Sequence, residues 1–319
     1  MNTRSLPVIA AYACLYLVWG TTYLGIAFAI ETLPPFTSGG LRFALAAILM
    51  GLWLAVRAPD QLRGLPWKHA LLSGALLGGM GNGLVVWAQQ GLPSGIAALV
   101  VSSIPVNVVL LDWLFFSRHA PSRRSLAGIG IALAGVLTIV LDRYGVGGEA
   151  SPVYLGAILC ATIAWSVGTL LQKRGTPPAR LLGVTFVQML SAAGLQLGLG
   201  FATGEWTGFD PGTVSAASLI AVAYLAVFGS IIALNCYVWL LTREPASKVA
   251  TYALVNPIVA VVLGALVLGE TLTPAVMLGA GLTLAGVALV LFHGASPLAF
   301  LRRRTRRPVA IQPAPCDGC

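Results

Sequence analysis

Residues 128–136 read GIGIALAGV and residues 279–287 read GAGLTLAGV, so one pattern of glycines and apolar residues occurs twice. Each copy lies in a long apolar segment and ends in Leu-Ala-Gly-Val. Apolar segments often match by chance at alanine, leucine and valine, but less often at glycines of fixed spacing. We therefore interpret the two stretches as parts of an internal repeat.

The repeat extends upstream at a constant shift of 152 residues. The shift carries seven residues onto identical ones: Trp87, Pro93, Ala98, Pro105, Val109, Leu111 and Leu114 onto Trp239, Pro245, Ala250, Pro257, Val261, Leu263 and Leu266. A weaker echo pairs Cys14 and Trp19 with Cys160 and Trp165, at equal spacing. A duplicated apolar chain of this kind is typical of membrane transporters.

The composition indicates that lipid surrounds most of the chain. Of its 319 residues, 57% are hydrophobic and 9% are charged, whereas a soluble domain has about 25% charged residues. The net charge of +9 does not indicate a nucleic-acid partner, because the basic residues occupy short gaps between apolar runs and a C-terminal tail. That distribution is typical of cytoplasmic loops and of contacts with membrane lipid.

Ten apolar segments approach the roughly 20 residues that a spanning helix needs. They are 6–30, 36–56, 69–90, 94–116, 125–141, 153–173, 181–203, 213–241, 246–268 and 275–293. Backbone groups in lipid must be satisfied within the segment, and no alternation indicates strands, so we expect an all-α integral membrane protein. The first segment exceeds the 7–15 residues of a signal-peptide core, so we expect it to be retained.

The basic residues predict the orientation. With the N-terminus inside, 17 of the 19 lysines and arginines fall in cytoplasmic loops or tails, and only Arg42 and Arg143 do not. Both termini should therefore be cytoplasmic. Each half has five spans, and because five is odd the second half must cross the membrane in the opposite direction to the first. We therefore expect a 5+5 inverted repeat of residues 6–141 and 153–293. Residues 294–319 should form a basic, disordered cytoplasmic tail.

Several motifs together resemble the drug/metabolite transporter superfamily, in its EamA-type branch of ten helices. They are WGTTYLGIAFAI at 19–30, ETLPPF at 31–36 with LRF at 41–43, the helices with Pro105 and Pro257, Gly269-Glu270, and both GxGxxLAGV stretches. The resemblance covers residues 6–293 and is specific for the family, not for a substrate.

This resemblance implies a central cavity lined by helices 1, 3, 4, 6, 8 and 9. It also implies export of amino acids or related metabolites across a bacterial inner membrane. The chain departs from the family at one position, since the family often has Gly-Glu after helix 4 and this chain has Ser117-Arg118. A symmetric counterpart of Glu270 is therefore missing from the first half.

Polar and aromatic residues deep in the spans are the candidate substrate site. They are Trp19, Thr22, Tyr23, Arg42, Asn82, Ser103, Asn107, Trp165, Thr169, Tyr252 and Asn256. Most recur at helical spacing on one face of their span. The alternative is that they are interhelical hydrogen-bonding groups worth about 0.6 kcal/mol each. Trp19 and Trp165 lie about 20 Å into their spans, so we expect both rings to flank the cavity.

Arg42 and Asp112 are the charges that lie well inside the predicted spans. A charge at the bilayer centre costs about 2.5–3.5 kcal/mol, so such residues suggest function. Arg42 could contact an anionic substrate group, reach the outer interface or pair with Glu31. Asp112 lies near the inner end of its span and should reach the basic loop at residues 118–124, with a role in ion coupling as the alternative.

Prolines and glycines suggest where the helices bend and pack. Pro105 and Pro257 each remove a backbone hydrogen bond in mid-span, and their matched positions suggest hinges, although membrane helices also tolerate simple kinks. Small residues four apart allow helices to approach closely. We expect such packing at Gly128-x-Gly130 and at three pairs: Gly74/Gly78, Gly79/Gly83 and Gly194/Gly198.

These features predict a secondary transporter of small metabolites that works by alternating access. The family resemblance implies in addition that it exports amino acids or their derivatives across the inner membrane. No nucleotide-binding motif occurs, so transport should be passive or ion-coupled, with protons as one candidate. We expect no cofactor and no metal, and a monomer or a homodimer. The alternatives are an intramembrane enzyme or flippase for lipid-linked substrates, and a structural or regulatory subunit.

Overall fold

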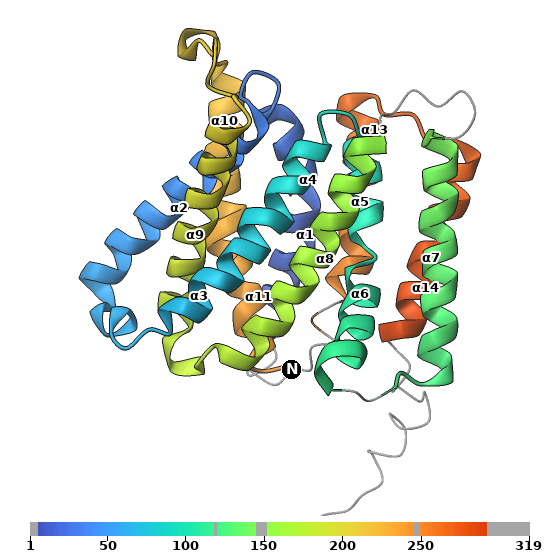
Figure 1. Cartoon of the computed structure of the whole chain (residues 1–319), viewed down its shortest axis with the longest axis horizontal. Helices are drawn as coiled ribbons and strands as arrows, with labels where there is room; N and C mark the ends of the chain where they lie inside the picture. The colour runs from blue at the N-terminus through green and yellow to red at the C-terminus, as the bar shows by residue number, and fades with distance from the viewer. Residues whose placement is uncertain (1–5, 118–119, 145–151, 245–248, 250, 292–319) are drawn as a thin grey trace, which may run out of the picture.

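A computed structural model describes residues 6–117, 120–144, 152–244, 249 and 251–291, and these residues form a helical bundle with no strand (Figure 1). Nine helices in this part of the chain are long and apolar enough to cross a membrane, and Tyr252–Leu268 is a shorter apolar helix. The all-α membrane fold is therefore confirmed. The C-terminal tail, with Cys316 and Cys319, lies outside the described residues.

The first half of the chain contains five spans. They are α1 (Leu6–Ala29); α2 (Pro35–Arg57); α3 (Trp67–Gly74), η2 (Ala75–Asn82) and α4 (Gly83–Ala88); α5 (Ser94–Val101), α6 (Ile104–Leu111) and η3 (Asp112–Ser117); and α7 (Arg123–Tyr144). The short turn η1 (Pro59–Leu62) follows α2. Prolines determine where two of these helices begin, since Pro35 occupies the first turn of α2 and Pro93 directly precedes α5.

The second half has the corresponding order. Its spans are α8 (Pro152–Gly175); α9 (Leu181–Ala202); α10 (Ala216–Tyr224), η6 (Leu225–Ala233) and α11 (Leu234–Leu241); α13 (Tyr252–Leu268); and α14 (Pro274–Leu291). Two short turns, η4 (Pro178–Arg180) and η5 (Pro211–Thr213), lie on either side of α9. Gly269 ends α13 with a φ of 67°, a left-handed conformation that glycine adopts without strain.

The third and eighth spans both contain a π-helical segment in mid-span. A shift of 152 carries η2 (75–82) onto residues 227–234, which overlap η6 (225–233). Segments with π geometry are rare and often mark functional sites. The packing is paired in the same way: α1 contacts the eighth and ninth spans, and α8 contacts the third and fourth. The inverted repeat itself stays a prediction.

Glycines set how closely the helices approach. A Cβ on Gly128 would lie 2.7 Å from the carbonyl oxygen of Gly286, so α7 and α14 pack backbone to backbone. Gly74 and Gly78 likewise bring the third span against α9. The prediction for Gly194/Gly198 is wrong, because a Cβ on either would meet nothing within 4 Å. Gly130 is also open, so only the first glycine of its pair packs.

The loops of the bundle lie at two faces. We call the upper face the end that holds residues 30–34, 89–93, 203–215 and 269–273, which is the top in Figure 1. The lower face holds residues 58–66, 176–180 and 242–244, near the start of α1. The basic residues predict that the lower face is cytoplasmic.

A reporter fusion tests this orientation. A reporter enzyme that is active only outside the cytoplasm should be silent when fused after Arg307, and active when fused near Gly147, because the two sites lie on opposite sides of the predicted membrane. Activity of each fusion, normalised to its amount in the membrane, is the measurement. The reverse pattern would contradict the ten-span orientation.

Candidate functional site

A cavity lies at the centre of the bundle. Its lining residues come from six spans: Trp19, Thr22, Tyr23, Ile26, Arg42, Gly81, Asn82, Val85, Val101, Ile104, Ala161, Thr162, Trp165, Tyr252 and Asn256. The second span contributes Arg42, which the family resemblance did not imply, whereas no lining residue comes from the eighth span.

Eight of the eleven predicted site residues line this cavity: Trp19, Thr22, Tyr23, Arg42, Asn82, Trp165, Tyr252 and Asn256. The other three are not among the lining residues. Ser103 Oγ donates to the carbonyl oxygen of Val100 (2.7 Å), and Thr169 Oγ1 to that of Trp165 (2.9 Å). Asn107 Nδ2 donates to Oγ1 of the lining residue Thr162 at 2.9 Å and so supports the wall from outside.

Four aromatic rings pack together at the cavity, and three of them, Trp19, Trp165 and Tyr252, line it as one aromatic wall. The Trp19 ring centroid lies 5.8 Å from that of Trp165, 5.0 Å from Tyr252 and 5.2 Å from Tyr237. Trp19 Nε1 donates to the carbonyl oxygen of Gly229, in the π-helical segment of the eighth span, at 3.2 Å. The two tryptophans thus face the interior, where they both pack on neighbours and border the cavity.

Arg42 supplies the one charge among the lining residues. Its side chain is 5% exposed, its Nε donates to Ser230 Oγ at 2.9 Å, and its Nη1 is buried without a hydrogen-bond partner. The suggested pairing with Glu31 is wrong, because the arginine turns inward and Glu31 is exposed. The arginine is also too deeply buried to reach the outer interface.

Two lining asparagines play different roles. Asn256, with its amide oriented to donate, bonds the carbonyl oxygens of Tyr252 (3.2 Å) and Tyr16 (3.1 Å), and so ties α13 to α1. Asn82 Oδ1 is buried in the third span and has no partner. Asn82 therefore keeps an acceptor that a ligand can use, whereas the amide N–H groups of Asn256 are used in hydrogen bonds between helices.

Two glutamates close the upper face between the halves of the chain. Glu205 accepts the backbone N–H groups of Phe36 (2.9 Å) and Thr37 (2.8 Å) at the start of α2. Glu270 accepts those of Ser94 (2.6 Å) and Gly95 (3.0 Å) at the start of α5. A carboxylate on a helix N-terminus is favoured by free N–H groups and the helix dipole.

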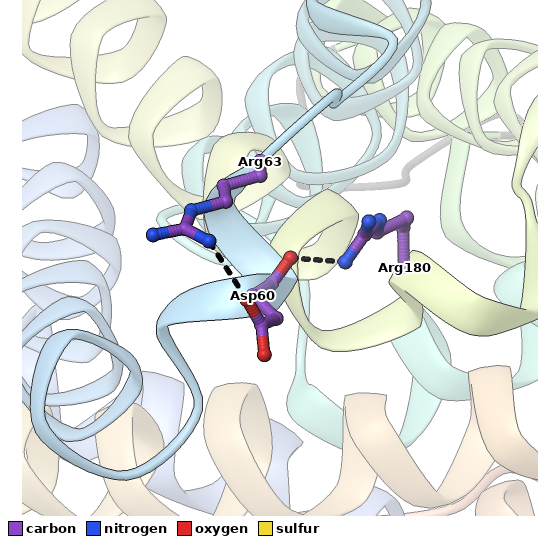
Figure 2. A network of polar contacts seen from close by, with 3 residues as sticks. All are labelled: Asp60, Arg63 and Arg180. Carbon is purple, nitrogen blue, oxygen red and sulfur yellow. Dashed lines mark hydrogen bonds and ion pairs between the residues drawn. The ribbon is translucent and has the colours of Figure 1, made fainter.

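The lower face has a weaker contact at the corresponding place. Figure 2 shows Asp60 between Arg63 and Arg180. The Asp60 carboxylate pairs with Arg63 at 3.2 Å, and both side chains are more than three-quarters exposed. Such a surface pair contributes little stability. Arg180, at the start of α9, donates to the main-chain oxygen of Asp60 and not to its side chain. The Asp60 carboxylate therefore does not bind the N-terminus of α9 as the two glutamates bind α2 and α5.

Asp112 lies at the lower end of the fourth span and pairs with Arg174 of α8 at 3.6 Å. Sequence reasoning placed it against the loop at residues 118–124, of which Arg118 lies outside the described residues. No group of three or more histidine, cysteine, aspartate or glutamate residues in the described part of the chain could hold a metal ion.

The profile of the EamA-like transporter family matches residues 7–141 and 153–292. The chain belongs to this family. It is 36% identical over 288 residues to the uncharacterized inner membrane transporter YedA of Escherichia coli K12, covering 89% of this chain and 90% of YedA. It is 25% identical to the probable amino-acid metabolite efflux pump of the same organism, covering 86% of this chain and 92% of the pump.

A solved structure shares this fold with a TM-score of 0.61 and 21% sequence identity, covering 94% of this chain and 99% of the other. The EamA-family protein is thus a multi-pass transporter of the inner membrane and not an enzyme. The prediction of a transporter is confirmed, and the enzyme alternative is wrong.

Proposed function

We propose that this EamA-family transporter exports amino acids or their derivatives by alternating access. The observation that carries the proposal is the central cavity, which combines one arginine with an aromatic wall. Two relatives support the substrate class and the direction, since one protein of Escherichia coli and one of Salmonella typhimurium are each called a probable amino-acid metabolite efflux pump.

The broken helices around the cavity support alternating access. The fourth span is interrupted at Ser102 and Ser103, directly before Pro105, and α13 begins at Tyr252 and contains Pro257 in its second turn. Proline cannot donate a backbone hydrogen bond, so both spans can bend at these points. We assign the two prolines as hinges about which the halves rock, driven by an ion gradient for which protons are the first candidate.

Uptake into proteoliposomes tests this function. The purified protein should move labelled leucine and phenylalanine, and a pH gradient should change the rate if protons are coupled. A Trp19→Phe/Trp165→Phe variant should fold and insert normally, but its affinity should fall about 10-fold or its preference should change, because it loses the indole surfaces at the cavity. Equal transport by both proteins would show that the tryptophans only pack.

A panel of amino acids, sugars, amines and lipid-linked sugars distinguishes the substrate classes. Movement of amino acids alone supports the proposal. Translocation of a lipid-linked substrate, with no amino acid transport, would favour the flippase alternative instead.

A further inference from the structure

The Arg42 guanidinium has hydrogen-bonding capacity that the fold leaves unused. Nε is bonded to Ser230 Oγ, but Nη1 is buried and unpartnered at the cavity wall. The ion pairs in the described residues lie elsewhere, at Asp60–Arg63 and Asp112–Arg174. A buried cation without an anion is costly in the membrane interior, so this side chain calls for a negatively charged ligand.

The chemistry of the guanidinium favours a carboxylate. Its planar fork presents parallel N–H donors that match two carboxylate oxygens. The neighbouring walls are apolar, formed by Ile26, Val85, Val101 and Ile104. They would not solvate the several charges of a phosphate, whereas one carboxylate neutralises one arginine.

A second lining residue of the same cavity, Asn82, also carries an unused polar group. Asn82 Oδ1 is a buried acceptor without a partner, and the rings of Trp19, Trp165 and Tyr252 border the same space. Acceptor oxygens and aromatic faces both stabilise an ammonium group. The lining contains no acidic side chain, so an amine without its own carboxylate would meet Arg42 with no compensating anion.

We propose that the cavity binds neutral amino acids with apolar side chains as zwitterions. Arg42 takes the carboxylate, Asn82 and the aromatic wall take the ammonium group, and the apolar residues of the third and fourth spans take the side chain. This inference rests on the proposed function and narrows its substrate class. It distinguishes the zwitterion from free amines, sugars and multiply charged metabolites.

Thermal stability of the purified protein tests the inference with compounds that share one skeleton: leucine, leucinamide, 4-methylpentanoate and 3-methylbutylamine. A ligand that binds the folded state raises the melting temperature with its concentration. Leucine should stabilise the protein most and 4-methylpentanoate less. The two compounds without a carboxylate should have no effect.

Variants test the carboxylate-binding and the ammonium-binding parts of the site separately. Arg42→Gln should weaken leucine affinity about 100-fold or more, because a buried charged partner is lost, and Arg42→Lys should weaken it about 10-fold, because the fork is lost. Asn82→Ala should weaken leucine about 10-fold but leave 4-methylpentanoate unchanged, since only leucine carries the ammonium group. Ser230→Ala is the matched control, which keeps the cation and removes its structural bond.

Stabilisation by leucinamide equal to that by leucine, or full leucine affinity in Arg42→Gln, would overturn the inference while leaving amino acid transport intact. Stabilisation by no compound of the panel would also overturn it. Arg42-dependent leucine binding without uptake in proteoliposomes would uphold the inference and contradict the proposed transport.

Discussion

Replacing Gly128 with leucine is expected to lower the melting temperature of the detergent-solubilised protein by about 5–10 °C. A Cβ at this position would lie 2.7 Å from the Gly286 carbonyl oxygen and 2.9 Å from Leu289 Cβ. Backbone cannot move aside as a side chain can, so α7 and α14 must separate. Overpacking costs about 1–3 kcal/mol or more, and each kcal/mol is worth roughly 2–4 °C in a protein of this size.

Gly130→Leu is the matched control, two residues away on the same helix. A Cβ on Gly130 would meet nothing within 4 Å, and the residue is exposed toward the surroundings of the bundle. Its melting temperature should stay within about 1–2 °C of the wild type. The pair Gly279→Leu and Gly281→Leu should repeat the contrast on α14. Equal effects of the two substitutions would contradict the packing face.

The sequence predicts the spans closely because the membrane imposes a simple rule on them. A helix must be apolar over its whole length and must end at polar or turn-forming residues. The predicted spans 36–56, 94–116 and 181–203 thus fall within a few residues of the helices Pro35–Arg57, Ser94–Phe115 and Leu181–Ala202. Apolar length, however, does not say which face of a helix is buried.

The structure departs from the sequence pattern where a side chain has a local alternative or a helix face has no neighbour. Ser103 and Thr169 lie deep in spans, but each hydroxyl bonds a carbonyl of its own helix, as such residues often do. Gly194 and Gly198 have the spacing of a packing motif, but no neighbouring helix covers them. Spacing shows which residues share a face and leaves open what that face contacts.

Tyr237 and Glu205 were missed for a different reason. Tyr237 packs on Trp19 behind the aromatic wall, and no repeat or motif distinguishes it in the sequence. Glu205 lies in a loop between two spans, where a carboxylate is ordinary, and its partners are 168 or more residues away. The family resemblance singled out Glu270, but no sequence pattern shows that its carboxylate binds the N-terminus of α5.

The difference between the two faces of the bundle suggests which end opens less readily. At the upper face, two carboxylates of the second half hold two helix N-termini of the first half. At the lower face, the Asp60 carboxylate of the matching loop binds only an exposed arginine (Figure 2). Thr37 Oγ1 also donates to Glu205, at 2.8 Å. The upper face should therefore open only when five charge-assisted hydrogen bonds are broken.

A Glu205→Gln/Glu270→Gln variant should accordingly open the upper face. Each substitution keeps the shape of the side chain and removes the negative charge. The loss should be about 2–4 kcal/mol in total, because bonds to charged groups are worth about 1.5–3 kcal/mol and neutral ones about 0.5–1.5 kcal/mol. The population open at the upper face should rise by about 30-fold or more.

The measurement is labelling of a cysteine introduced at Ile26, a cavity residue on the upper side of Trp19. The background is a variant without the five native cysteines, Cys14, Cys160, Cys236, Cys316 and Cys319. A membrane-impermeant maleimide added to intact cells should react at least ~10-fold faster in the double glutamine variant, because labelling follows the open population. Asp60→Asn is the matched control and should leave the rate unchanged, since its carboxylate holds no helix. Unchanged labelling of the double variant would show that apolar packing, and not the two carboxylates, closes this face.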